Sequence, residues 1–108
     1  MDEDEYLQVA EIALRKIVDG FEDIDPDEAD LESSGDVITI TFPSGKRCVV
    51  NTQRPSRQIW LAGAQRAWHF SYESTGGRWM DDKGTGTELF QAISDLVKDG
   101  SGVTLALK

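Results

Sequence analysis

The chain has 108 residues, of which 39% are hydrophobic, and it carries a formal net charge of −9. This amount of apolar material can form one compact core but not two, so we expect a single domain over residues 1–108. The negative charge argues against nucleic acid and anionic membranes as partners, and the sequence contains no apolar run of about 18 residues that could span a membrane.

The negative charge is concentrated at one end of the chain. Residues 1–36 contain 14 acidic and 2 basic side chains, a net of −12, whereas residues 37–108 contain 6 acidic and 9 basic ones, a net of +3. A region this acidic attracts cations and basic protein surfaces, so we expect positively charged partners. The acidic residues 2–5 directly after Met1 resemble neither a secretory signal nor an arginine-rich transit peptide, which predicts a cytoplasmic protein.

Apolar residues recur at helical spacing between positions 6 and 21. Intervals of three and four residues place them on one stripe, which predicts an amphipathic helix whose acidic side faces water. Glu11 and Arg15 are spaced to form a pair on that side, and Gly20 is the expected end of the helix. The stripe consists of Leu7, Ala10, Leu14, Ile17 and Phe21, widened by Tyr6, Ala13 and Val18.

The segment 22–30 is strongly acidic and contains Pro26, so it predicts a loop that leads into a short edge strand at Leu31. Its aspartates at positions 23, 25 and 27 are spaced like ligands 1, 3 and 5 of an EF-hand. The sixth position of that motif is Glu28 instead of glycine, however, and the twelfth is Ser34 instead of glutamate. The sequence therefore argues against an enclosed calcium site.

What remains is a dense carboxylate surface without enclosing geometry. Carboxylate oxygens suit hard cations, so this surface is a candidate for weak, exchangeable binding of ferrous or ferric iron with water completing the coordination. The alternative is that the acidic residues only keep the protein soluble, because most runs of charge are solvated faces. The clustering of charge in the first third of the chain makes the cation-binding interpretation more competitive with the solubility interpretation, but it does not decide between them.

From residue 36 onward the apolar spacing changes to two, which is typical of strands with one buried face. Ile38, Ile40 and Phe42 should face the core, and a turn at residues 43–45 should close a hairpin onto the next strand. Cys48 should point inward from that strand. As the only cysteine it cannot form an internal disulfide, and we interpret it as structural rather than reactive.

The strand expected over residues 58–62 should leave Gln58 and Trp60 on the face opposite the core. An outward tryptophan indicates either a protein contact site or a side chain half covered by Arg57 and His69. We interpret His69 as a surface residue beside Trp60 rather than as a metal ligand.

Two further strands are expected at residues 68–72 and 78–80, with a glycine turn between them. Thr85 and Glu88 then have the spacing of a capping box, so a second amphipathic helix should begin there and close near Gly100. The apolar end of the chain should lie along the body of the domain. The order helix, five or six antiparallel strands, helix predicts an α+β two-layer sandwich with both helices on one face of the sheet and the other face open.

The sequence lacks the residues that common catalytic sites require. His69 is the only histidine, no CxxC pair supplies thiolates, and no serine lies in a G-x-S-x-G turn. The glycines of residues 84–86 lack the rest of a dinucleotide-binding fingerprint. We therefore expect neither an enzyme nor a nucleotide-binding protein.

The segment 51–62 resembles the signature strand–loop–strand of the frataxin family, because its Asn, Gln, Pro, Gln and Trp stand in matching places. The flanking strands, the closing helix and the acidic first helix are similar to that family as well, so the resemblance covers nearly the whole chain. The short length and the absence of a presequence resemble the bacterial, CyaY-type branch.

This resemblance implies a frataxin-like sandwich and an iron-binding accessory and regulatory protein of iron–sulfur cluster assembly. Such a protein docks on the cysteine desulfurase and its scaffold protein, is a monomer without metal and can oligomerise with iron. By position, weakly bound iron would lie on an acidic ridge formed by Asp4, Glu11, Asp19, Glu22, Asp23, Asp25, Asp27, Glu28, Asp30 and Glu32. The partner contact on the sheet would comprise Asn51, Gln53, Gln58 and Trp60.

Two other functions could use the same residues. A ferroxidase or iron-storage protein would oxidise ferrous iron on these carboxylates, whereas a pure interaction module would bind its partner without iron and lose affinity as salt is added. The chain also departs from the family pattern, since its first helix has no histidine and Pro26 interrupts its acidic loop. Which of the carboxylates bind metal is therefore open.

Overall fold

One antiparallel sheet of six strands forms the centre of the structure, and each strand pairs with its neighbours in sequence. The computed structural model describes residues 1–107; Lys108, the last residue of the expected domain, lies outside the described residues. The elements in chain order are α1 (Glu3–Gly20), β1 (Asp30–Ser34), β2 (Val37–Thr41), β3 (Arg47–Gln53), β4 (Gln58–Gly63), β5 (Arg66–Glu73), β6 (Arg78–Asp81) and α2 (Leu89–Ser101).

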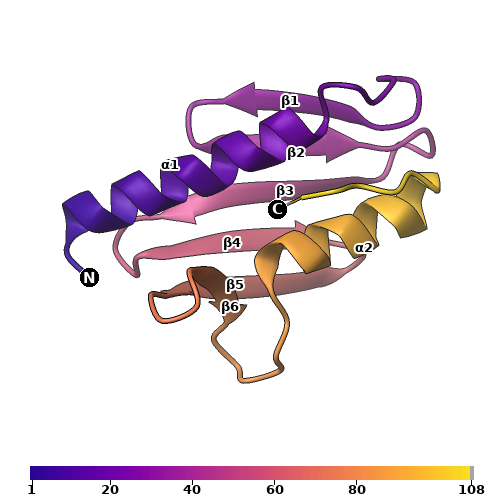
Figure 1. Cartoon of the computed structure of the whole chain (residues 1–108). Coiled ribbons are helices and arrows are strands. Elements are labelled where there is room, and N and C mark those ends of the chain that lie inside the picture. Colours follow the sequence, from indigo (N-terminus) through magenta and orange to yellow (C-terminus); the bar gives the residue numbers. More distant parts are fainter. Residues whose placement is uncertain (108) are drawn as a thin grey trace.

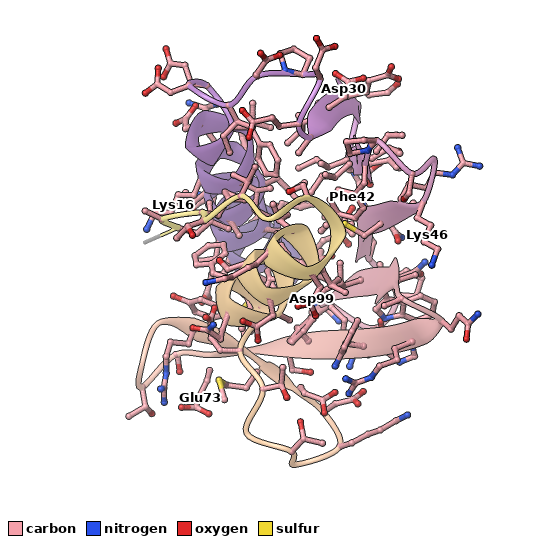
Figure 2. The ribbon with its side chains drawn as sticks, turned by 90° about the vertical axis from the view of Figure 1, so that its right-hand side faces the viewer. Lys16, Asp30, Phe42, Lys46, Glu73 and Asp99 are labelled. Atoms are coloured by element: carbon pink, nitrogen blue, oxygen red, sulfur yellow. The ribbon has the colours of Figure 1, made fainter. Side chains whose placement is uncertain are left out.

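Both helices lie on the same face of the sheet, with α1 beside the half that contains β1 and β2 and α2 beside the half that contains β4 to β6 (Figure 1). The edge-on view shows a helical layer and a sheet layer with the core between them (Figure 2). This confirms the predicted α+β two-layer sandwich, with six strands. Neither helix in residues 1–107 is long and apolar enough to cross a membrane.

Helix α1 begins at an aspartate cap and buries a stripe slightly rotated from the predicted one. The side chain of Asp2 accepts a hydrogen bond from the backbone N–H of Glu5 at 2.8 Å, which satisfies one of the free donors of the first turn. The fully buried residues are Tyr6, Ala10, Ala13 and Ile17, while Leu7 and Leu14 pack only partly against the core. The buried stripe therefore combines Ala10 and Ile17 from the centre of the predicted stripe with Tyr6 and Ala13 from its margin.

The strands alternate as predicted between a buried and an outward face. Ile38, Ile40, Cys48 and Val50 all point inward and are at most 1% exposed. Burial raises the pKa of the Cys48 thiol to about 11, so this thiol is protonated at neutral pH and is a poor nucleophile. The structural interpretation of Cys48 is confirmed.

The predicted start of the second helix was wrong by three residues. Gly86 has a φ of +79°, which a helix cannot include, and the hydroxyl of Thr85 donates to the buried carboxylate of Asp81 at 2.7 Å instead of capping a helix. Glu88 is itself the cap of α2, because its carboxylate accepts from the backbone N–H groups of Phe90 and Gln91. The Thr85–Glu88 spacing was therefore not a capping box.

The predicted end of α2 near Gly100 is confirmed, because the helix ends at Ser101 and the left-handed Gly102, with φ of +77°, caps it. Gly100 lies inside the last turn, where a Cβ would approach the ring of Phe42 to 2.5 Å, so the absence of a side chain allows close packing there. The chain after Gly102 runs back over the helical layer (Figure 1) and buries Leu105, as expected.

Candidate functional site

The acidic ridge, defined as the ten carboxylates predicted above, extends from Asp4 along α1, through the loop that links it to β1, and into β1 itself. Most of its charge gathers at one end of the molecule, where carboxylate-tipped side chains stand out from the loop around Asp30 (Figure 2). The strand register places Asp30 opposite Thr41 and Glu32 opposite Thr39, so both carboxylates project on the open face of the sheet while Leu31 packs against the core.

The loop from residue 21 to residue 29 is held by short backbone turns. The carbonyl of Asp25 accepts from the backbone N–H groups of Glu28 and Ala29, and the carboxylate of Asp25 accepts from the N–H of Asp27 at 2.9 Å. Ala29 is buried and fixes the loop to the core. The backbone is thus anchored while its acidic side chains remain in solvent, in agreement with the loop predicted from Pro26 and the charge.

The ridge does not bring all of its members together. Asp4 and Asp19 lie at opposite ends of α1, about 22 Å apart at the rise of an α-helix. Glu11, between them, forms an exposed ion pair with Arg15 at 3.0 Å. Within residues 1–107, no group of three or more His, Cys, Asp or Glu side chains lies close enough to hold a metal ion. The ridge is therefore an extended negative surface and not a preformed cage.

The C-terminal end of α1 strengthens the negative potential of the ridge. A helix C-terminus carries partial negative charge, which basic side chains in the last turn usually offset, but the last turn of α1 contains none. Asp19 lies in that turn and Glu22 and Asp23 follow directly. These carboxylates repel one another and the helix end, a cost in stability that makes the region attractive to cations.

The open face of the sheet brings together the four residues predicted for partner contact. Asn51 of β3 lies opposite Trp60 of β4, and Gln53 lies opposite Gln58 in the adjacent row. All four side chains are half-buried. The two rows across the sheet consist of Val37, Asn51, Trp60 and His69, and of Gln53, Gln58, Ser71 and Met80.

The indole of Trp60 is fixed by contacts that the sequence only partly indicated. Its ring stacks on the imidazole of His69, with centroids 4.1 Å apart and planes 16° apart, in agreement with the predicted position of His69 beside Trp60. Its indole N–H donates to Oε1 of Gln58 at 3.0 Å. Nε2 of Gln58 in turn donates to Oδ2 of Asp82 at 2.9 Å and contacts Oγ of Ser71 at 3.1 Å. Sequence reasoning missed Asp82 and Ser71, since no local spacing links them to Gln58.

A buried tyrosine, also missed, connects the acidic helix to this face. The hydroxyl of Tyr6 donates to the backbone carbonyl of Gln58 at 2.7 Å and accepts from the backbone N–H of Gln53 at 3.1 Å. Its ring packs edge-on against Trp79. Burial raises the pKa of this phenol above its ordinary value, so the hydroxyl stays protonated and can donate. Tyr6 thereby ties α1 to the hairpin that carries the four contact residues.

The sequence profile of the frataxin-like domain matches residues 1–102. Curated proteins described as iron–sulfur cluster assembly protein CyaY are similar over nearly the full chain. The protein from Paraburkholderia phytofirmans is 36% identical over all of this chain and 99% of its own length. The protein from Paraburkholderia xenovorans is 37% identical over 94% of this chain and 93% of its own length.

Solved structures show the same fold. Frataxin from Psychromonas ingrahamii, of the CyaY family, superposes with a TM-score of 0.88 at 27% identity and covers 100% of this chain and 99% of its own. A trimeric frataxin from the yeast Saccharomyces cerevisiae, in complex with ferrous iron, has a TM-score of 0.59 at 28% identity and covers 95% of this chain and 88% of its own.

Proposed function

This chain belongs to the frataxin-like family, in its CyaY branch, and from this premise we propose that it is an iron-binding accessory and regulatory protein of iron–sulfur cluster assembly. The curated relatives are named as iron–sulfur cluster assembly proteins, and one structural neighbour holds ferrous iron. The acidic ridge binds iron weakly. The ridge and the open face together dock on the cysteine desulfurase and its scaffold protein, without a catalytic group of the chain's own.

One observation carries this proposal: within residues 1–107, no basic side chain forms an ion pair with the dense end of the ridge. The ion pairs among these residues join Glu11 to Arg15 and Glu73 to Arg78, and His69 approaches Asp82 at 4.0 Å. The eight ridge carboxylates from Asp19 to Glu32 are absent from these pairs. A surface that keeps this much unneutralised charge at one end favours an external cation or a basic protein surface.

The ridge side chains suit iron by chemistry and limit how it binds. Carboxylate oxygens are ligands for both ferrous and ferric iron. Because no three potential ligands converge within residues 1–107, each iron would meet one or two carboxylates and keep water in the rest of its coordination shell. Such binding is weak and exchangeable, as a regulatory signal requires.

Iron and protein would then compete for, or jointly occupy, one negative surface. The dense end of the ridge meets a basic surface of the desulfurase, while the open face around Trp60 contacts the scaffold protein. Two ligands that act on one surface change each other's affinity reciprocally, so the iron level can modulate sulfur transfer. We expect the protein to be a monomer without metal and to oligomerise with iron.

Cluster assembly on purified desulfurase and scaffold protein tests this function, with and without the chain and with and without ferrous iron. The chain should change the rate of cluster formation, and the size of the change should depend on iron. A variant with Asp23→Lys and Asp27→Lys should lose the effect, because both changes reverse charge at the dense end of the ridge. An assembly rate that is the same with and without the chain at every iron level would reject the proposal.

A matched control variant, Asp95→Lys with Asp99→Lys, makes the same net charge change on the exposed side of α2, outside the ridge. It should keep the effect on cluster assembly. An equal loss in both variants would show that overall charge matters and that the ridge has no special role.

The alternative function is a ferroxidase or iron-storage activity on the same carboxylates. The trimeric yeast frataxin in complex with ferrous iron motivates this alternative. Oxygen uptake by ferrous iron separates it from the accessory role. A rate in the presence of the chain no faster than that of iron alone in buffer would exclude the ferroxidase.

A further inference from the structure

We propose that Gln58 is a positioning residue for Trp60 and not itself a docking contact, and that Asp82 and His69 complete the surface that Gln58 organises. The inference rests on the proposed docking of the open face, and it reassigns one of the four residues that the family resemblance implies. It also adds two residues that the resemblance leaves out.

Both N–H groups of the Gln58 side chain have hydrogen-bond partners within the protein. Its Nε2 has two N–H groups, and its neighbours at hydrogen-bond distance are Oδ2 of Asp82 at 2.9 Å and Oγ of Ser71 at 3.1 Å. Its Oε1 accepts from the indole of Trp60 at 3.0 Å. The amide therefore has no free N–H to offer a partner, although it lies at the centre of the predicted contact surface.

The chemistry of the neighbours fixes the orientation of this amide. An indole N–H can only donate and a carboxylate can only accept, so a flipped Gln58 would lose the bonds to both Trp60 and Asp82. The bond to the charged carboxylate is the stronger kind. A polarised relay thus runs from Trp60 through Gln58 to Asp82.

His69 connects the two ends of this chain of hydrogen bonds, because it contacts both Asp82 and Trp60. The backbone N–H of Asp82 donates to the backbone carbonyl of His69 at 2.9 Å, and the His69 ring supports the indole of Trp60. Asp82 is held in place because the preceding residue, Asp81, is buried and accepts from Thr85 while its own N–H bonds to the carbonyl of Thr87. Four residues from β4, β5 and the loop after β6 therefore form a closed circuit around the indole.

The consequence is a tryptophan whose orientation is set before any partner arrives. Docking on a preorganised side chain avoids the entropy cost of ordering it, which raises affinity without an added contact. The two rows of the open face around it consist of apolar, amide and hydroxyl side chains and the imidazole of His69, and the neighbouring carboxylate of Asp82 is bonded to Gln58. The occupant that these rows fit is therefore a largely neutral, partly apolar segment of the scaffold protein, while the basic surface of the desulfurase meets the carboxylates of the ridge.

Isosteric substitutions test the relay in the intact chain. Gln58→Glu keeps the size and the acceptor for Trp60 but places a second carboxylate against Asp82. Binding to the purified desulfurase–scaffold complex should weaken by about tenfold, and the indole N–H signal of Trp60, identified by Trp60→Phe, should shift in the NMR spectrum of the free protein. Adding Asp82→Asn should restore a donor toward the new glutamate at unchanged net charge.

The double variant Gln58→Glu with Asp82→Asn is therefore predicted to bind within about threefold of the wild type and to recover the wild-type indole signal. Asp82→Asn alone should change affinity by less than about threefold, because the carbonyl of an asparagine can still accept from Gln58. A Gln58→Glu variant with wild-type binding and indole signal would overturn the inference. A loss that Asp82→Asn does not rescue would overturn it as well.

Trp60→Ala distinguishes this failure from failure of the proposed function. If Trp60→Ala leaves binding unchanged, docking through the open face is wrong, while the indole signal of the Gln58 variants still reports on the relay in the free protein. If Trp60→Ala abolishes binding but the Gln58 variants act like the wild type, the docking stands and the relay is wrong.

Discussion

The carboxylates of the acidic ridge have few partners, whereas the side chains at the centre of the open face hold one another in place. Within residues 1–107 only two ridge carboxylates, those of Glu11 and Asp25, accept hydrogen bonds. Around Trp60, by contrast, the indole N–H and both polar atoms of the Gln58 amide meet specific donors or acceptors at 2.9 to 3.1 Å. The ridge should therefore respond to the number of charges and to salt, and the open face to the identity of single atoms.

The largest effect should come from breaking the open face. Trp60→Ala removes the one large aromatic anchor there, and such anchors carry about 2 kcal/mol or more of binding free energy, so affinity for the desulfurase–scaffold complex should fall by about thirtyfold. Val37→Ala, an exposed residue in the same row, is the control and should cost less than about threefold. Titration calorimetry measures both, and equal losses would contradict a central role for Trp60.

A second substitution tests the tie between the two regions. Tyr6→Phe removes the hydroxyl that serves the backbone of Gln53 and Gln58, leaving a buried donor and acceptor without a partner, so the free energy of unfolding should fall by about 1 to 3 kcal/mol. The half-buried Tyr72→Phe is the control and should change it by about 0.5 kcal/mol or less. Urea denaturation measures both variants.

The pH dependence of stability gives Tyr6 a second readout. Its folded pKa is raised by burial above the ordinary 10.0, so the phenol of the unfolded chain ionises first. The free energy of unfolding should therefore fall as the pH rises above 10, and it should fall less in Tyr6→Phe. Identical slopes for the two proteins, together with an unchanged urea midpoint at neutral pH, would contradict the role given to this hydroxyl.

The third prediction concerns the ridge and sharpens its contrast with the open face. Raising the salt concentration from about 0.05 M to about 0.5 M should weaken binding to the desulfurase–scaffold complex by about tenfold. A variant with Asp23→Asn, Asp27→Asn and Glu28→Gln should bind about tenfold more weakly at low salt and respond little to added salt. In Trp60→Ala the salt dependence of binding should persist. Its loss in this variant would show that the ridge and the open face do not act separately.

The smallest effect should appear within α1 itself. Asp19 lies at the negative end of the helix and Asp4 at its positive end, so neutralising them should act in opposite directions. Asp19→Asn should raise the free energy of unfolding by about 0.3 to 1 kcal/mol and Asp4→Asn should lower it by about as much. If both substitutions shifted the urea midpoint in the same direction, the helix dipole would not be what determines the effect of Asp4 and Asp19 on stability.

The two regions also differ in how far the sequence predicted them. Runs of charge and alternating apolar residues are local patterns, so α1, the acidic loop after it, and the inward set of Ile38, Ile40 and Cys48 were all predicted correctly. Strand parity, which is local too, placed Gln58 and Trp60 on the outward face, whereas Asn51 and Gln53 were predicted from the family resemblance.

What the sequence did not predict depends on pairings far apart along the chain. Gln58 and Asp82 are 24 residues apart, and Tyr6 and Gln58 are 52 residues apart; only the register of the sheet and the position of α1 bring them together. The close approach of Gly100 to Phe42 could not be predicted either, because it is a tertiary contact. Thr85 was misread because its hydroxyl bonds to Asp81, four residues earlier, and not to a helix.

A titration of the protein with ferrous iron under anaerobic conditions, followed by NMR, tests the central claim most directly. The backbone signals of residues 19–32 should lose intensity first because a paramagnetic ion would lie on the dense end of the ridge, while the indole signal of Trp60 should remain. Iron that leaves residues 19–32 unaffected, or that first broadens the signals around Trp60 and His69, would contradict the division of this molecule into a metal-binding ridge and a separate docking face.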